Sequence, residues 1–294
     1  MIKNFGVIKK SIQPSDYIMV GEKSDLDINP SGNWSDFLPI KEYQHFEWGD
    51  AKDCVTMSAL NCIETLLKYK YNIDFNASDK FTAKMSGTTH RGNWMTKVAD
   101  SIRNDGLVLE TDYPSTTAIS WEDFYKPIIE ELKTKGKRFK ELYDVDYRWL
   151  VPTNAYQLEM ALKRGPIQVV IYAWEKPVNG IYERTEKETN HAVELFNSIH
   201  NKYFEVFDHY DKTIKKLAWN YKIQHGFIYN ITRKNMRFIK EKEKEDVYLL
   251  KGGIAYAIND RMDYLNLEQD WSPVIEVEKI TQPISSKKMY IFVR

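Results

Sequence analysis

Cys54-Val55-Thr56-Met57-Ser58-Ala59-Leu60-Asn61-Cys62-Ile63-Glu64 is the most informative stretch of this chain, and Asn190-His191-Ala192-Val193 is its counterpart far downstream. Apolar residues recur in the first stretch at the spacing of one helical face, and Asp53 precedes it as a candidate N-cap. The second stretch opens a strand-like run. A helix that begins at a cysteine and a strand that begins at a histidine suit a thiol nucleophile and its base.

A thiol in the first turn of a helix lies at the positive end of the helix dipole, where backbone N–H groups have no intrahelical partner. Both effects favour the thiolate, the nucleophilic form of Cys54. The alternative interpretation is a small buried hydrophobe, the commoner role of a free cysteine. Cys62 lies about 12 Å further along the predicted helix at ~1.5 Å per residue, too far for a disulfide, and is expected in the core.

Composition is that of an ordinary globular protein. The chain has 294 residues, 43% of them hydrophobic, and its 42 basic side chains balance 42 acidic ones. This length predicts one large domain with a small additional one. A net charge of zero offers no general attraction for a polyanion, so nucleic acid is not expected as a partner.

No segment has the pattern of a targeting or membrane-spanning sequence. Residues 1–10 lack the apolar core of a signal peptide, and no apolar run approaches the roughly 20 residues that span a bilayer. We therefore expect a protein without membrane contact that is not secreted through a signal peptide and is located in the cytoplasm.

The order of the predicted elements indicates an α+β fold with separate helical and β halves. Residues 1–40 contain scattered Gly, Pro, Ser and Asp and predict an extended arm. After the cysteine helix, helices are predicted at 95–104, 121–133 and 154–163. β-branched and aromatic runs then predict strands at 167–172, 191–196, 203–207 and 225–231.

A separate small unit is predicted at the C-terminal end. Residues 236–246 are rich in alternating lysine and glutamate and are interpreted as a solvated linker. Beyond them, short strand-like runs occur at 248–250, 254–258 and 289–293. The predicted domains are an arm at 1–40, a main domain at 41–235, the linker, and a β-rich module at 247–294.

Residues 40–232 resemble the papain family of cysteine peptidases, and most of all the papain-like proteins of tailed bacteriophages. The matching motifs, in the family's order, are the cysteine helix, a glycine-containing loop at 86–94, a "G…E…YP" stretch at 106–114, an "AL…GP" stretch at 161–166, a "GIY" at 180–182 and the histidine stretch. His191 follows Cys54 by 137 positions, within the roughly 130–150 typical of the family.

The resemblance implies a two-lobed fold, a helical lobe beside an antiparallel β lobe, and peptide-bond hydrolysis through a covalent acyl-enzyme. It makes Cys54 the nucleophile and His191 the general base. Asp208 takes the place of the asparagine that orients the histidine, and a carboxylate there would still accept the imidazole N–H. Tyr210 takes the place of a shielding tryptophan.

The resemblance also implies an oxyanion donor and a substrate loop. The family's glutamine usually lies six residues before the cysteine, where this chain has Trp48, so Gln44 is the candidate donor with the Cys54 backbone N–H. Gly92 and Asn93 match the loop whose backbone pairs with an extended substrate. Asn190, just before the histidine, is assigned to the substrate site with them.

Other chemistry has little support in the sequence. His209 is the main rival of His191, but adjacent strand residues point to opposite faces, so Asp208 facing the cleft would turn His209 away. No Cys-x-x-Cys, His-Glu-x-x-His or phosphate-binding glycine motif is present. We therefore expect neither metal nor cofactor, and a protein or peptide as substrate.

Two alternatives stay open. The altered residues around the cysteine, the Trp48 position and Asp208 suit a papain-like structural or binding protein of a phage virion, whose partners would be other virion proteins. The same Cys-His-Asp order also occurs in transglutaminase-like and peptidoglycan-amidase-like enzymes. The glycine-containing loop and the "YP" stretch favour the peptidase.

Overall fold

The structure is a computed structural model of the whole chain, and it describes residues 4–8, 28–152, 154–211, 213–234, 237–241, 247–251, 254–257 and 275–277. The chain divides into two compact units. The first comprises residues 1–136 and 145–231, and the second comprises residues 137–144 and 232–294. The candidate site residues all belong to the first unit.

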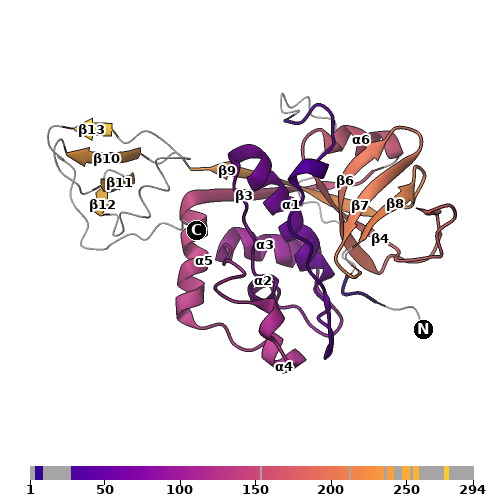
Figure 1. Cartoon of the computed structure of the whole chain (residues 1–294), viewed down its shortest axis with the longest axis horizontal. Helices are drawn as coiled ribbons and strands as arrows, with labels where there is room; N and C mark the ends of the chain where they lie inside the picture. Colours follow the sequence, from indigo (N-terminus) through magenta and orange to yellow (C-terminus); the bar gives the residue numbers. More distant parts are fainter. Residues whose placement is uncertain are drawn as a thin grey trace. The chain divides into compact units, whose positions relative to one another are not determined.

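The helices dominate the N-terminal half, as predicted. They are α1 Cys54–Tyr71, α2 Asp79–Met85, α3 Met95–Asp105, α4 Trp121–Phe124, α5 Glu130–Leu142 and α6 Ala155–Leu162, with single 3-10 turns at Ser35–Phe37 and Ser115–Thr117. α1 packs against α2 and α3 on one side and against strands β4 and β6 on the other. Figure 1 shows it between the helical half and the sheet.

A mixed seven-stranded sheet forms the other half. Its strands are β3 Tyr143–Leu150, β4 Ile167–Ile171, β5 Ile181–Tyr182, β6 His191–Ile199, β7 Tyr203–Asp208, β8 Thr213–Ala218 and β9 His225–Arg233. The order across the sheet is β3-β9-β4-β6-β7-β8-β5. The pairs from β9 through β4, β6 and β7 to β8 are antiparallel, and β5 pairs parallel with β8. The predicted α+β class with separate halves is confirmed.

The central helix is buried because both halves of the first unit pack on it. Every residue from Cys54 to Leu67 is buried. Asp53 directly precedes this helix, but its side chain makes no capping hydrogen bond, so the predicted N-cap role is wrong. Instead the Asp53 backbone carbonyl accepts from the N–H groups of Thr56 and Met57.

Polar contacts in the interior fix α1 on the sheet. The amide of Gln168 on β4 donates to the Val55 carbonyl at 2.7 Å and to the Ser58 hydroxyl at 2.9 Å. The Thr65 hydroxyl donates to the carboxyl of Glu194 on β6 at 2.9 Å. These bonds set the position of α1 along β4 and β6, and with it the position of Cys54.

Two predicted elements differ from the observed ones. The single helix predicted at 121–133 is divided into α4 and α5, because Pro127 between them cannot continue a helix. Residues 237–241, interpreted from their charges as part of a linker, form strand β10. Pairing with a neighbouring strand decides the conformation of this segment, whereas its composition indicated only exposure to solvent.

The second unit contains a four-stranded sheet. Its strands are β10 Arg237–Glu241, β11 Val247–Lys251, β12 Ile254–Ala257 and β13 Ile275–Val277, in the order β12-β11-β10-β13. β10 and β13 pair parallel, and the other pairs are antiparallel. The strand predicted at 289–293 lies outside the described residues.

Glu194 is a fully buried carboxyl whose charged form is disfavoured. Burial raises its pKa to about 8, although the hydrogen bond from Thr65 opposes this. From about pH 4.5 to pH 8, unfolding releases the proton that the folded protein holds, so this group's contribution to stability is present at low pH and is lost as pH rises.

We predict that Glu194→Gln removes this dependence. Between pH 4 and pH 9, wild type should lose on the order of 4 kcal/mol of unfolding free energy relative to the variant. Urea unfolding across this pH range measures it. Glu205→Gln, a half-buried site on β7, is the control and should show no such trend; a parallel result for both variants would contradict the assignment.

Candidate active site

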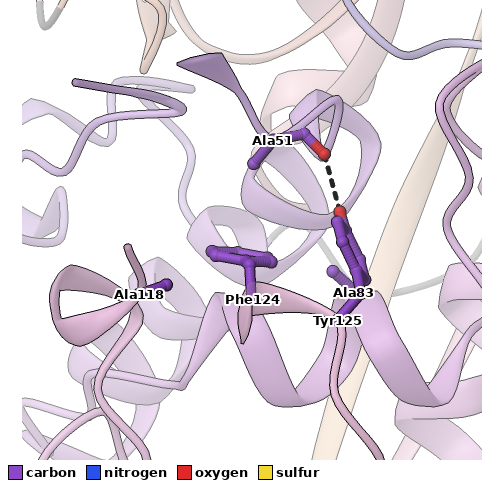
Figure 2. Packing of buried hydrophobic residues seen from close by; sticks show 5 residues of the cluster. All are labelled: Ala51, Ala83, Ala118, Phe124 and Tyr125. Atoms are coloured by element: carbon purple, nitrogen blue, oxygen red, sulfur yellow. Dashed lines mark hydrogen bonds between the residues drawn. The ribbon is translucent and has the colours of Figure 1, made fainter. Parts of the chain in front are cut away.

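The segment that leads into α1 is held by a short hairpin and a hydrophobic cluster. Strands β1 His45–Phe46 and β2 Gly49–Asp50 form the hairpin. The cluster contains Ala51, Ala83, Ala118, Phe124 and Tyr125, with Phe46, Trp48 and Trp121 packed against it. Figure 2 shows the Tyr125 hydroxyl donating to the Ala51 carbonyl, at 2.6 Å. This packing fixes the backbone three residues before Cys54.

Cys54 lies at the first position of α1, as predicted, and is 2% exposed. The backbone N–H of Ala192, the residue after His191, donates to its thiol. The thiol is therefore within hydrogen-bond reach of the backbone adjoining the histidine. Burial raises the pKa of Cys54 well above its usual value, which the Ala192 N–H only partly offsets. The expected preference for the thiolate is not met in this closed arrangement, because burial outweighs the helix end.

His191 and Asp208 form a buried pair. His191 Nε2 lies 2.7 Å from Asp208 Oδ1, and both side chains are almost wholly enclosed. The other ring nitrogen, Nδ1, is buried and has no hydrogen-bond partner among the described residues. An imidazole oriented through Nε2 with Nδ1 unengaged is the arrangement that a proton acceptor for a neighbouring thiol requires.

Asp208 is held by four donors. Besides His191, Tyr210 donates its backbone N–H to Oδ1 at 3.1 Å, and Oδ2 accepts from Trp174 Nε1 at 3.0 Å and from Lys215 Nζ at 2.8 Å. Burial disfavours the carboxylate, but His191 and Lys215 outweigh it and hold the pKa of Asp208 well below its usual range. Asp208 is therefore an anion that orients His191.

Trp174 and Lys215 were missed by the sequence analysis. Tyr210, expected in the shielding position, donates its backbone N–H to Asp208, and its ring lies 6.5 Å from the His191 ring. The indole of Trp174 lies 6.0 Å from the same ring. Lys215 sits in the strand Thr213–Ala218, where its neighbour Lys216 has the same charge. No local signal distinguishes the buried lysine; only the pairing of β7 with β8 brings it to Asp208.

His209 points away from this pair, as expected from strand alternation. Its Nε2 contacts the side-chain amide of Asn61 on α1, and its Nδ1 lies 3.1 Å from the Glu42 carbonyl. The carbonyl of His209 accepts from the Gln44 N–H at 3.2 Å. His209 thus supports the segment that carries Gln44.

Gln44 is wholly buried and donates through Nε2 to two acceptors. One is Asp50 Oδ1 in the hairpin, at 2.8 Å, and the other is the backbone carbonyl of Phe5, at 2.6 Å. The Phe5 ring centroid lies 4.9 Å from that of His191. Gln44 therefore binds a peptide carbonyl beside the candidate base.

Residues 4–8 run along the candidate site as a segment with a bend at Gly6 and one isolated parallel bridge at Val7. The Phe5 N–H donates to the Asn190 carbonyl at 3.0 Å. Further along, the Asn93 N–H donates to the Gly6 carbonyl at 2.8 Å, and the Ile8 N–H donates to the Asn93 carbonyl at 2.8 Å. This pairing with Asn93 is parallel. The backbone of the predicted substrate loop thus binds a segment of its own chain.

The loop can make these contacts because the Asn93 side chain is bonded within the loop and Gly92 has no side chain. The Asn93 amide donates to Ser86 and Thr88 within the loop, which leaves its backbone for the segment. Gly92 has φ +92°, and a Cβ there would lie 1.7 Å from the Gly6 carbonyl oxygen. Glycine is therefore required at position 92 for the segment to approach.

Asn190 contributes its backbone rather than its side chain. Its amide bonds both backbone groups of Ala173, at 2.7 and 3.1 Å, while its carbonyl accepts from Phe5. The structure thus brings Cys54, His191 and Asp208 together, with Gln44, Gly92, Asn93 and Asn190 along the segment of residues 4–8.

Comparison with known proteins identifies the fold. No protein-family model matches the sequence, and no curated protein is similar to it at the sequence level. Among solved structures, the digestive procathepsin L 3 of Tenebrio molitor is similar with a TM-score of 0.53 and 15% identity, over 76% of this chain and 75% of that one. The stem bromelain precursor is similar with a TM-score of 0.52 and 16% identity, over 75% and 76% of the two chains.

A third similar structure, reported for the mite allergens Blo t 1 and Der p 1, has a TM-score of 0.50, with 14% identity over 75% of both chains. The chain therefore has a papain-like fold, as predicted. Identities this low establish the fold and not the activity. The expected relation to phage proteins is not addressed by these similarities and stays a prediction.

Within the described ranges, no three His, Cys, Asp or Glu side chains are grouped as ligands of a metal ion. Nor does any helix in this part of the chain combine the length and apolarity needed to cross a membrane. The chemistry available at the site is that of the thiol, the imidazole, the carboxylate and the amide.

We predict that Lys215→Met raises the pKa of Asp208. Without the ammonium, only His191 opposes the effect of burial on the carboxylate, so Asp208 should take up its proton at higher pH than in wild type. Loss of one partner from a buried pair should also destabilise the fold at pH 7 by about 3 kcal/mol. NMR titration of the Asp208 carboxyl and urea unfolding measure the two effects.

Lys215→Arg is the control for this prediction, because it keeps the charge. It should keep the pKa of Asp208 well below its usual range. An Asp208 pKa that Lys215→Met leaves as low as in wild type would show that Lys215 has only a packing role.

Proposed function

We propose that this protein is a cysteine peptidase that hydrolyses peptide bonds through Cys54. The observation that carries the proposal is the binding of the Phe5 carbonyl by Gln44, beside the His191–Asp208 pair and at the N-terminal end of α1. A peptide carbonyl held by a buried amide donor next to a candidate thiol and base has the arrangement of a peptidase with a peptide in its cleft.

The proposed mechanism uses the groups already described. His191 Nδ1 takes the proton of the Cys54 thiol, and the thiolate attacks the substrate carbonyl carbon. Gln44 Nε2 and the Cys54 backbone N–H donate to the oxyanion that forms. His191 then gives its proton to the leaving amine, and water hydrolyses the acyl-enzyme with His191 as base. Asp208 keeps the imidazole oriented throughout.

The segment of residues 4–8 acts in this proposal as a block of the cleft. It covers the His191 ring, occupies Gln44 and pairs with Asn93, so an outside peptide cannot use the same groups. Burial is the largest cause of the raised pKa of Cys54, and in this proposal the blocking segment contributes to that burial. Two of the similar structures are titled as a pro-enzyme and a precursor, which supports a blocked form here.

A papain-like structural or binding protein of a virion is the second candidate. The observation that favours it is the burial of the thiol, which disfavours the reactive thiolate. The two candidates differ in what happens when the segment is displaced. A peptidase then gains a reactive thiol, whereas a structural protein does not.

We predict that Gly6→Val displaces the segment. Gly6 has φ +122°, and a Cβ there would lie 2.2 Å from the Lys52 carbonyl oxygen, so a larger residue cannot keep this path. Alkylation of Cys54 by iodoacetamide, followed by mass spectrometry, should accelerate by about tenfold or more. Buried Cys62 serves as the internal standard and should stay unmodified.

Gly180→Val is the matched control for Gly6→Val. Gly180 also has a positive φ, +79°, but nothing lies within 4 Å of its Cβ position. Its alkylation rate should equal that of wild type. Equal rates in both variants would show that residues 4–8 do not limit access to the thiol.

We further predict that the Gly6→Val protein cleaves denatured casein. Adding Cys54→Ala or His191→Ala should reduce the rate by about a thousandfold or more, and Gln44→Ala by about a hundredfold. Fast alkylation of Cys54 without casein cleavage would favour an amidase-like substrate. Slow alkylation that does not depend on His191 would favour the structural protein.

A further inference from the structure

A cavity of about 700 Å³ lies beside the hairpin that follows Gln44. Four carboxyl residues line it, Glu42, Glu47, Asp79 and Glu110, against a single lysine, Lys41. The other lining residues are Ile40, Tyr43, His45, Phe46, Trp48, Ser115, Thr116, Ala118 and Ile119. The wall of this cavity is therefore both acidic and apolar.

Asp79 is the residue that calls for an explanation. It is 4% exposed and lines the cavity, yet its carboxyl has no hydrogen bond or ion pair among the described residues. Burial raises the pKa of Asp79 well above its usual value, and the charges of Glu42, Asp53 and Glu110 raise it further. A buried carboxyl without a partner is costly, so its place at a cavity wall indicates that the partner comes from outside.

Glu110 is the second acidic group of the wall, and it is only partly compensated. It accepts from the Ser115 N–H at 2.6 Å and from the Ser115 hydroxyl at 3.1 Å. Burial nevertheless raises its pKa to about 7, with a contribution from Glu42. Lys80 on α2 attracts Glu110 electrostatically, although its ammonium lies over the Tyr113 ring, 4.6 Å from the centroid. Since burial still raises the pKa of Glu110, a further positive charge would stabilise the Glu110 carboxylate.

The mouth of the cavity is apolar. Ile40, Tyr43 and Ile119 are exposed, Ile119 by 82%, although each is a large hydrophobic side chain. Phe46 and Trp48 continue this surface into the hairpin. An acidic interior with an apolar mouth matches a cationic head attached to an apolar body, and such a match is typical of side-chain recognition.

The geometry speaks against a metal ion, because no group of three candidate ligands is arranged for one among the described residues. An organic cation is the remaining class. We propose that this cavity binds a lysine or arginine side chain of a second polypeptide, whose apolar neighbours pack on Ile40, Tyr43 and Ile119. The size of the cavity and the apolar surface around its mouth exceed what a small amine alone would fill.

This binding does not depend on peptidase activity. It can therefore be measured in the full-length Cys54→Ala protein, in which no peptide is hydrolysed. The probe is acetyl-Leu-Arg-Leu-amide, and the matched probe is the citrulline peptide, which replaces the guanidinium by a neutral group of the same size. Calorimetry should show binding of the arginine peptide at least about tenfold tighter than that of the citrulline peptide.

Asp79→Asn and Glu110→Gln test the two acidic groups. Each should weaken binding of the arginine peptide by about tenfold or more. Each should also leave the peptide-free protein at least as stable as wild type, because it replaces a buried carboxyl whose charged form is disfavoured by a neutral amide of the same size. Weaker binding without loss of stability separates loss of a ligand group from misfolding. Glu122→Gln, an exposed site on α4 outside the cavity wall, is the control and should change neither.

Three results would overturn the proposal. The first is equal binding of the arginine and citrulline peptides. The second is arginine-peptide binding that both Asp79→Asn and Glu110→Gln leave intact, which would place the peptide elsewhere. The third is a rise in melting temperature with calcium or magnesium chloride that these two variants abolish, which would make the cavity a metal site instead.

Discussion

The burial of α1 between the helical half and the sheet is the constraint on which the rest of the first unit depends. Because every residue from Cys54 to Leu67 is enclosed, both halves must pack on one helix. The bonds from Gln168 to Val55 and Ser58 set the height of that helix on the sheet. The thiol at its first position is thereby brought to the start of β6, where His191 begins the strand.

The buried acidic residues of the first unit have two different environments. Asp208 is surrounded by donors, and Lys215 balances its charge, so the anion is stable and can orient His191. Among the described residues, no cation forms an ion pair with Asp79 or Glu110, and burial, followed by repulsion from Glu42, raises the pKa of each. The first arrangement is complete within the chain. The second is incomplete, and that difference separates the candidate active site from the acidic cavity.

Much of the fold could be predicted because its strongest patterns are local. The cysteine helix, α3 and α6 follow apolar periodicity, and β4, β6, β7 and β9 follow β-branched and aromatic runs. Failures occurred where local and tertiary preferences disagree. A proline divides the helix predicted at 121–133, and strand β10 forms from a segment whose charges indicate a solvated linker, because its neighbours supply the hydrogen bonds.

For the site, the sequence by itself determined which residue types stand at the start of α1 and β6 and at the end of β7, through the resemblance in motif order. Only the tertiary structure decided that Lys215 and Trp174 bond to Asp208 and that residues 4–8 lie on Gln44 and Asn93. It also decided that the Asp79 carboxyl has no hydrogen bond or ion pair within the described ranges. The physical reason is range. Helix and strand patterns come from neighbours in the chain, whereas these contacts join residues brought together only by packing.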